Sequence, residues 1–157
     1  MNNENYGLMR FTGTIIVSPP LDKNKFFFVL NKIDEKWSLP TGKINPFEHP
    51  SDGAVREVLE EIGFTVVVKQ LVGIWPFTSP KGNSIINIVY SGEVIEGIPK
   101  VDSKESISKI DIFSLREVRD LHKKGKLRGS ASLRFLEEYC AGRVWPVDQI
   151  IKPTLVD

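Results

Sequence analysis

The sequence predicts a mixed α/β (α+β) fold in a single domain over residues 1–157. The chain contains both short apolar segments rich in β-branched residues and segments of helical periodicity, the pattern of a domain with both strands and helices. A length of 157 residues lies near the usual size of one compact domain. The chain has neither a repeat of fixed period nor a Pro, Gly or Ser tract long enough to be an interdomain linker, so one domain is expected.

Three strands are predicted in the first quarter of the chain. Residues 11–17 are rich in β-branched side chains and are followed by a serine and two prolines, as at the end of a strand. Residues 26–30 form an apolar run too short for a helix, which indicates a strand buried on both faces. Residues 35–39 form a shorter strand candidate, and residues 41–50, which contain a glycine, an asparagine and two prolines, are predicted as a loop.

Three more strands are predicted in the second half. Residues 65–74 and 85–95 have strand composition and are separated by residues 75–84, which contain two prolines and a glycine and are predicted as a loop. Residues 110–113 alternate apolar and polar side chains, which favours a short strand. The segment after residue 142 allows no assignment.

Helices are predicted from their end signals. Ser51 or Asp52 can cap a helix that runs to residue 62, where Gly63 supplies the left-handed terminating conformation. Ser114 and Glu117 form a capping box for a second helix, which ends by residue 125. A third helix is expected from residue 130 or 132 to residue 141, with its apolar side chains on one face.

Composition excludes several classes of protein. Twenty-one Lys and Arg against twenty Asp and Glu give a net charge of +1, so no global field attracts the chain to nucleic acid, and a nucleic-acid partner is not expected. The apolar runs are far shorter than the roughly 20 residues needed to cross a bilayer. The N-terminal residues lack the features of a secretory signal, so a cytoplasmic location is expected. One cysteine, Cys140, is too little sulfur for a structural zinc site, so any metal should bind oxygen ligands.

The predicted helix over residues 51–62 carries acidic side chains along one side. Like charges three and four residues apart oppose a helix by a few tenths of a kcal/mol per pair, and Arg56 is the one cation nearby in the helix. Two interpretations stay open: a solvent-facing stripe, or a site where Mg²⁺ relieves the repulsion. The apolar side consists of Val55, Val58, Leu59 and Ile62, and the acidic side of Glu57, Glu60 and Glu61.

The segment that ends in this helix has a specific spacing. Residues 42–64 read GKINPFEHPSDGAVREVLEEIGF, which resembles the Nudix box at every specified position, so the chain resembles the Nudix hydrolases. The resemblance implies an α/β/α sandwich with a mixed parallel and antiparallel sheet. It also implies hydrolysis of a nucleoside diphosphate linked to another moiety. The positions that match are Gly42, Glu48, Arg56, Glu57, Val58, Glu60, Glu61, Gly63 and Phe64.

The resemblance also implies roles for individual residues. Glu57 would accept a proton from the attacking water as well as bind metal, and Arg56 and Glu48 would brace the loop against the helix. The implied cofactor is Mg²⁺, for which Mn²⁺ can substitute. The implied metal ligands within the box are Glu57, Glu60, Glu61 and the carbonyl of Gly42.

A further carboxylate after the box serves some family members as a ligand or as the base. Glu105, just before the strand expected at residues 110–113, is the preferred candidate, with Glu93 and Glu96 behind it. The alternative is that all three are ordinary surface residues.

Aromatic residues suggest where a substrate binds. Trp75 and Phe77 resemble part of the Trp-Pro-Phe-Pro array of the NADH pyrophosphatase branch, and Pro80 lies about where ADP-ribose hydrolases carry a proline. Either aromatic ring can stack on a purine or pack in the core. Phe47, beside the expected metal loop, can narrow that loop or pack on a base.

These observations favour a small nucleotide substrate of the ADP-ribose, NADH or nucleotide-sugar type. Nucleoside triphosphates and dinucleoside polyphosphates are alternatives, as is a non-catalytic module that senses nucleotides. Removal of an RNA cap would require a basic channel, which the near-neutral composition does not indicate. A homodimer and a monomer fit the sequence equally well.

Overall fold

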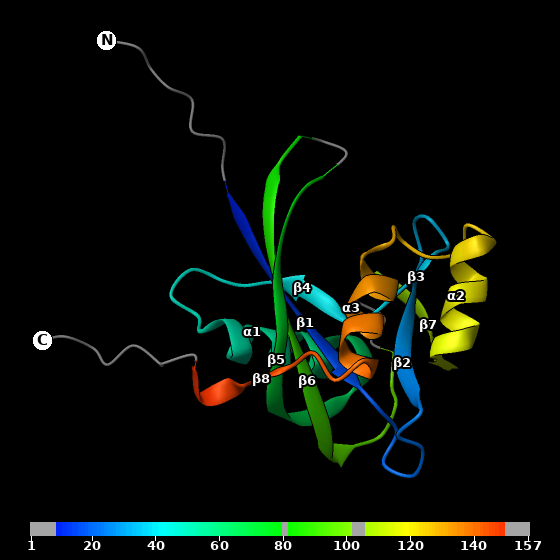
Figure 1. Cartoon of the computed structure of the whole chain (residues 1–157), viewed down its shortest axis with the longest axis horizontal. Coiled ribbons are helices and arrows are strands. Elements are labelled where there is room, and N and C mark those ends of the chain that lie inside the picture. Colours follow the sequence, from blue (N-terminus) through cyan, green and yellow to red (C-terminus); the bar gives the residue numbers. More distant parts are fainter. Residues whose placement is uncertain (1–8, 80–81, 102–105, 150–157) are drawn as a thin grey trace, which may run out of the picture.

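The computed structural model contains both strands and helices with a mixed sheet, which confirms the predicted fold class (Figure 1). It describes residues 9–79, 82–101 and 106–149. The elements in chain order are β1 (Arg10–Val17), β2 (Lys25–Asn31), β3 (Trp37–Ser38), β4 (Thr41–Lys43), α1 (Pro50–Ile62), β5 (Phe64–Thr78), β6 (Ser84–Gly97), β7 (Ile107–Ser114), α2 (Leu115–Lys123), α3 (Ala131–Cys140), β8 (Trp145–Pro146) and the 3₁₀ turn η1 (Val147–Gln149).

The strands form two sheets. The larger has the order β4-β1-β6-β5-β8, and the smaller has the order β3-β2-β7. In the larger sheet β1 runs parallel to β6, with Gly13 opposite Ile88, whereas its other pairs are antiparallel. The sheet is therefore mixed, as the resemblance to the Nudix hydrolases implied.

Helices cover both faces of the larger sheet, with α1 on one side and α3 on the other (Figure 1). Because successive strand residues point to opposite faces, Ile15 packs in the core under α1 and Ile16 in the core under α3. Val58 of α1 and Phe135 of α3 are buried in these two cores, respectively. No helix among the described residues has the length and apolar character needed to pass through a bilayer.

Two segments predicted as loops contain strand. Residues 75–78 continue β5, because they pair with the start of β6 as far as Thr78 opposite Ser84. Pro76 is tolerated there because β8 pairs with β5 only at Gln70 and Leu71, which leaves the strand an edge at the proline. Thr41–Lys43 forms β4 because it pairs with β1. Prolines and glycines are local signals, and pairing with a distant strand overrides them here.

The helix ends agree with prediction except at the start of α1. Gly63 closes α1 with φ of +78°, and Ser114 and Glu117 form the expected capping box of α2. However, α1 begins at Pro50, and the cap is His49 rather than Ser51 or Asp52. Nδ1 of His49 accepts a hydrogen bond from the Ser51 backbone N–H at 3.3 Å. Proline at the first helical position fits this earlier start, since its ring favours helical φ and needs no hydrogen-bond partner.

Candidate active site

The segment with the Nudix-box spacing folds as strand β4, a loop and helix α1. The loop over residues 44–49 leads from the edge strand of the larger sheet back over that sheet, where α1 packs against β1, β4 and β5. The predicted residues of the box therefore converge from two elements and the loop between them, on the side of the molecule at the left of Figure 1.

Glu57 of α1 lies directly on the backbone of Gly42 in β4. A Cβ atom at position 42 would overlap the carboxyl group of Glu57, because the carboxyl carbon and both carboxyl oxygens would lie well inside van der Waals contact distance of it. A glycine is therefore required at position 42 for this side chain to reach the strand. The side chain of Glu57 is 15% exposed, so a carboxylate is held at the floor of the site rather than in bulk solvent.

Arg56 connects the loop to the helix. Its Nε and Nη2 donate to the two carboxylate oxygens of Glu48 at 2.9 and 3.0 Å, a bidentate pair. Nη2 also donates to the carbonyl of Lys43 at 2.8 Å. Nη1 donates to Glu57 Oε1 at 2.9 Å and to Glu60 Oε2 at 3.0 Å. One guanidinium thus orients three carboxylates and the end of β4.

The acidic side of α1 differs from the predicted arrangement. Glu61 is only 8% exposed, and its Oε2 accepts the backbone N–H of Thr41 at 3.0 Å, whereas Leu59, predicted on the packed side, is 50% exposed. The cause is the position of β4 at the edge of the larger sheet. The outward N–H groups of an edge strand do not face another strand of its sheet, so the N–H of Thr41 donates to the Glu61 carboxylate of the helix instead. Glu60, with its side chain 44% exposed, is the one acid of the three that faces solvent as a surface stripe would.

The other predicted carboxylates lie elsewhere. Glu105 is outside the described residues. Glu93 is on β6, where it forms ion pairs with Lys69 at 3.4 Å and Lys23 at 3.9 Å, and Glu96 is exposed opposite Thr65. In the part of the chain that the structure describes, no group of three or more His, Cys, Asp and Glu side chains could hold a metal ion as it stands.

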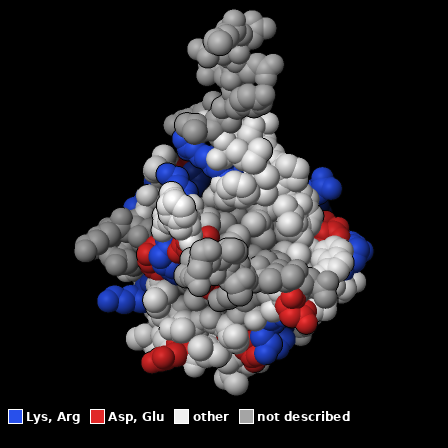
Figure 2. Space-filling model, turned by 90° about the vertical axis from the view of Figure 1, so that its left-hand side faces the viewer, with Lys and Arg blue, Asp and Glu red and all other residues white. Residues whose placement is uncertain are grey.

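A cavity of about 650 Å³ adjoins the loop. Figure 2 shows the side of the molecule that lies at the left of Figure 1, where Lys, Arg, Asp and Glu side chains form several separate groups among uncharged residues. Phe47 projects from the loop beside the cavity and is fully exposed. The described lining residues are Met9, Arg10, Phe11, Lys43, Ile44, Asn45, Pro46, Phe47, Glu48 and Pro50.

The structure does not bring the other two predicted aromatic residues to this loop. Trp75 packs against Phe135 of α3, with ring centroids 4.6 Å apart, in the core on the opposite face of the sheet from α1. Phe77 is 45% exposed near the end of β5. Pro80 lies outside the described residues.

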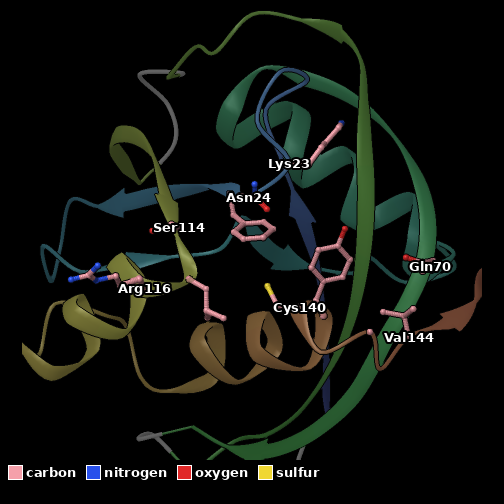
Figure 3. Close-up of a pocket in the computed structure, with 11 residues that line it drawn as sticks. Lys23, Asn24, Gln70, Ser114, Arg116, Cys140 and Val144 are labelled. Carbon is pink, nitrogen blue, oxygen red and sulfur yellow. The ribbon is translucent and has the colours of Figure 1, made fainter.

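A different cavity, of about 610 Å³, is bounded by α2, α3, β5 and the β1–β2 loop (Figure 3). Figure 3 shows Lys23 and Asn24 on one side of it and Cys140 and Val144 on the other. No residue of the box lines this cavity. Cys140 is exposed at the end of α3, and partial desolvation raises the pKa of its thiol.

Some contacts of the candidate site were not predicted from the sequence. The carbonyl of Lys43 and the N–H of Thr41 are backbone groups, and no residue type marks them. The cap of α1 by the side chain of His49 was not predicted either. Pro50 directly after it was the available signal, because proline favours the first position of a helix.

Hydrogen bonds from Arg56 lower the pKa of the Glu48 carboxyl below its ordinary value, and the N–H of Asn45 adds to this. A carboxylate whose pKa is lower in the folded state stabilises the fold above its unfolded pKa of about 4.3, and this stabilisation is lost as pH falls through the folded pKa. We expect Glu48→Gln to have a lower Tm than wild type at pH 7, with the difference shrinking below about pH 4. Thermal unfolding from pH 3 to pH 8 measures this, and a difference that stays constant down to pH 3 would contradict it.

Comparisons with known proteins agree with this geometry. A family model described as NUDIX domain matches residues 14–134. A solved structure of a NUDIX hydrolase from Nitrosomonas europaea aligns with a TM-score of 0.83 and 25% identity, over 93% of this chain and 98% of that one.

Two curated relatives are similar over shorter parts of their length. The m7GpppN-mRNA hydrolase dcap-2 of Caenorhabditis elegans is 30% identical over 115 residues, which are 68% of this chain and 14% of that protein. An RNA pyrophosphohydrolase of Rickettsia conorii is 50% identical over 46 residues, which are 27% of this chain and 29% of that protein. The chain thus spans well under two thirds of either relative. Because the family model covers more than half of the chain and the fold and box geometry agree with it, this chain belongs to the NUDIX domain family.

Proposed function

We propose that the chain is a magnesium-dependent pyrophosphohydrolase that cleaves the diphosphate linkage of a nucleoside diphosphate derivative. The observation that carries this proposal is the Glu57 carboxylate seated on Gly42, beside a loop that Arg56 and Glu48 hold in place. An ordinary surface stripe does not require a glycine under one of its acids.

The donor set fits a hard divalent cation. Carboxylate and carbonyl oxygens are the ligands that Mg²⁺ prefers, and Glu57 and Glu60 already converge on one cationic nitrogen of Arg56. A metal bound by these oxygens would offset the negative charge of the substrate phosphates and lower the pKa of the attacking water molecule. The residues that would hold it are Glu57, Glu60, Glu61 and the carbonyl of Gly42.

The protein groups have separate tasks in this proposal. Glu57 accepts the proton of the attacking water at a carboxylate oxygen, in line with the general-base role of a positioned carboxylate. Arg56 orients Glu57 and Glu60 through Nη1 and holds the loop through Glu48. Arg10 and Lys43 line the adjoining cavity and supply positive charge for phosphate oxygens.

The cavity supports a small nucleotide as substrate. Its volume of about 650 Å³ lies within the range of small-molecule sites. ADP-ribose, NADH and nucleotide sugars are the favoured class. Nucleoside triphosphates and dinucleoside polyphosphates are the second candidate, which the name of the m7GpppN-mRNA hydrolase favours, since m7GpppN contains a chain of three phosphates.

The test is a panel assay of the full chain with Mg²⁺, with Mn²⁺ and with EDTA. The panel contains ADP-ribose, NADH, a nucleotide sugar, dGTP, a dinucleoside tetraphosphate and a capped RNA. We expect release of a nucleoside monophosphate or of pyrophosphate from at least one compound, abolished by EDTA. Tight nucleotide binding without product formation in the presence of either metal would overturn the proposed hydrolase activity and favour a module that senses nucleotides. Sedimentation of the same samples separates monomer from homodimer.

A further inference from the structure

Phe47 occupies a backbone position that favours glycine. Residues 45–48 form a turn closed by a hydrogen bond from the Glu48 N–H to the Asn45 carbonyl at 3.1 Å, with Pro46 second and Phe47 third. The φ of Phe47 is +66°. Proline in the second place and positive φ in the third are features of a type II turn, in which glycine or asparagine is preferred at the third position. A phenylalanine there destabilises the folded chain relative to glycine.

The ring gains nothing from packing that would compensate for this cost. Phe47 is fully exposed, whereas a phenylalanine that stabilises a fold does so by burying its ring. The backbone around it is held firmly: Glu48 Oε2 accepts the Asn45 N–H at 2.8 Å, and the Glu48 carboxylate takes two hydrogen bonds from Arg56. The turn therefore holds the backbone of Phe47 in place and presents its aromatic ring to solvent.

That position adjoins the proposed site. Phe47 lines the cavity of about 650 Å³ together with the two cations Arg10 and Lys43. Glu48, the next residue, binds the same guanidinium that orients Glu57. A planar ring beside cationic side chains suits a ligand with an aromatic base and a phosphate chain. Every nucleotide base has a planar face that can stack on an aromatic side chain.

We propose that Phe47 is a specificity-determining residue whose ring stacks on the base of the nucleotide substrate while Arg10 and Lys43 face its phosphates. This inference rests on the proposed function and names how the same site selects a nucleotide over a phosphate ester without a base. The backbone strain is then retained because the ring contributes to substrate binding rather than to folding.

The proposal predicts opposite effects on stability and on substrate binding. Phe47→Gly should raise Tm by about 2–4 °C, because glycine adopts the required φ without strain. The same variant should raise KM for the best substrate of the panel by about 5-fold or more, with kcat within about 2-fold of wild type. Phe47→Tyr retains a ring and should keep KM near the wild-type value.

Glu35 offers a matched control for the strain. It also has positive φ, +51°, and lies in the turn between β2 and β3, on the opposite side of the molecule from the box loop (Figure 1). Glu35→Gly should therefore raise Tm in the same way while leaving KM unchanged. A rise in KM with this control would show that strain relief alone alters the site, and would overturn the stacking role.

A binding measurement separates this inference from the proposed function. In Phe47→Trp, AMP should quench the added tryptophan fluorescence, measured as the difference from wild type, whereas ribose 5-phosphate should not, because it lacks the base. Unchanged KM in Phe47→Gly, or equal quenching by both compounds, would overturn stacking while leaving hydrolysis intact. Absence of turnover by wild type across the panel would instead overturn the proposed function and this inference with it.

Discussion

Glu57→Gln is expected to reduce kcat by about 100- to 10,000-fold in the presence of saturating Mg²⁺, the range for loss of a positioned acid–base group. The amide keeps the size of the side chain on Gly42 and can still accept a hydrogen bond from Arg56 Nη1. It removes the negative charge that attracts a divalent cation and the basic oxygen that takes a proton. Tm should change little, since the packing is preserved.

The matched control for this variant is Glu137→Gln on α3. Glu137 also forms an ion pair with an arginine, Arg119, at 3.0 Å, but it lies outside the box. Its substitution should leave kcat and KM at wild-type values. The binding of Mn²⁺, followed by electron paramagnetic resonance, should weaken in Glu57→Gln and not in the control. Glu57→Gln protein that retains more than about a tenth of wild-type kcat would refute the role of this carboxylate as base.

Gly42→Ala is expected to lower kcat/KM by a similar factor although it adds only one methyl group. The Cβ atom would overlap the Glu57 carboxyl group, so Glu57 must leave the floor of the site and its contact with Arg56. A displaced carboxylate loses both the orientation for proton transfer and its place beside Glu60. Steady-state kinetics, with circular dichroism to establish folding, measure this effect.

A double-mutant cycle tests whether the effect of Gly42→Ala passes through Glu57. In the Glu57→Ala background no carboxyl group remains to overlap, so Gly42→Ala should cost no further stability there. Directly contacting residues typically show a coupling free energy of about 0.5–3 kcal/mol in such cycles. Equal destabilisation by Gly42→Ala in both backgrounds would mean that the methyl group disturbs β4 itself rather than Glu57.

Local signals in the sequence predicted much of the scaffold. Helix ends depend on residues close in the chain, so Gly63 and the Ser114–Glu117 capping box were assigned correctly. Strands with β-branched or continuous apolar composition were also predicted, because the composition of each segment is enough to indicate that it is buried. By contrast, residues 75–78 contain a proline and were predicted as a loop, since only pairing with β6 shows them to be strand.

The site shows the same division. The spacing from Gly42 to Phe64 determined, without a structure, which acids share one side of α1 and to which family the chain is similar, because helical periodicity and motif spacing are properties of the linear sequence. Only the tertiary structure decided which side of α1 is covered. The edge strand β4 draws Glu61 inward and leaves Leu59 exposed, Arg56 joins three carboxylates, and a tight turn presents the ring of Phe47. These features depend on contacts between segments distant in sequence or on backbone dihedral angles, which residue type alone does not specify.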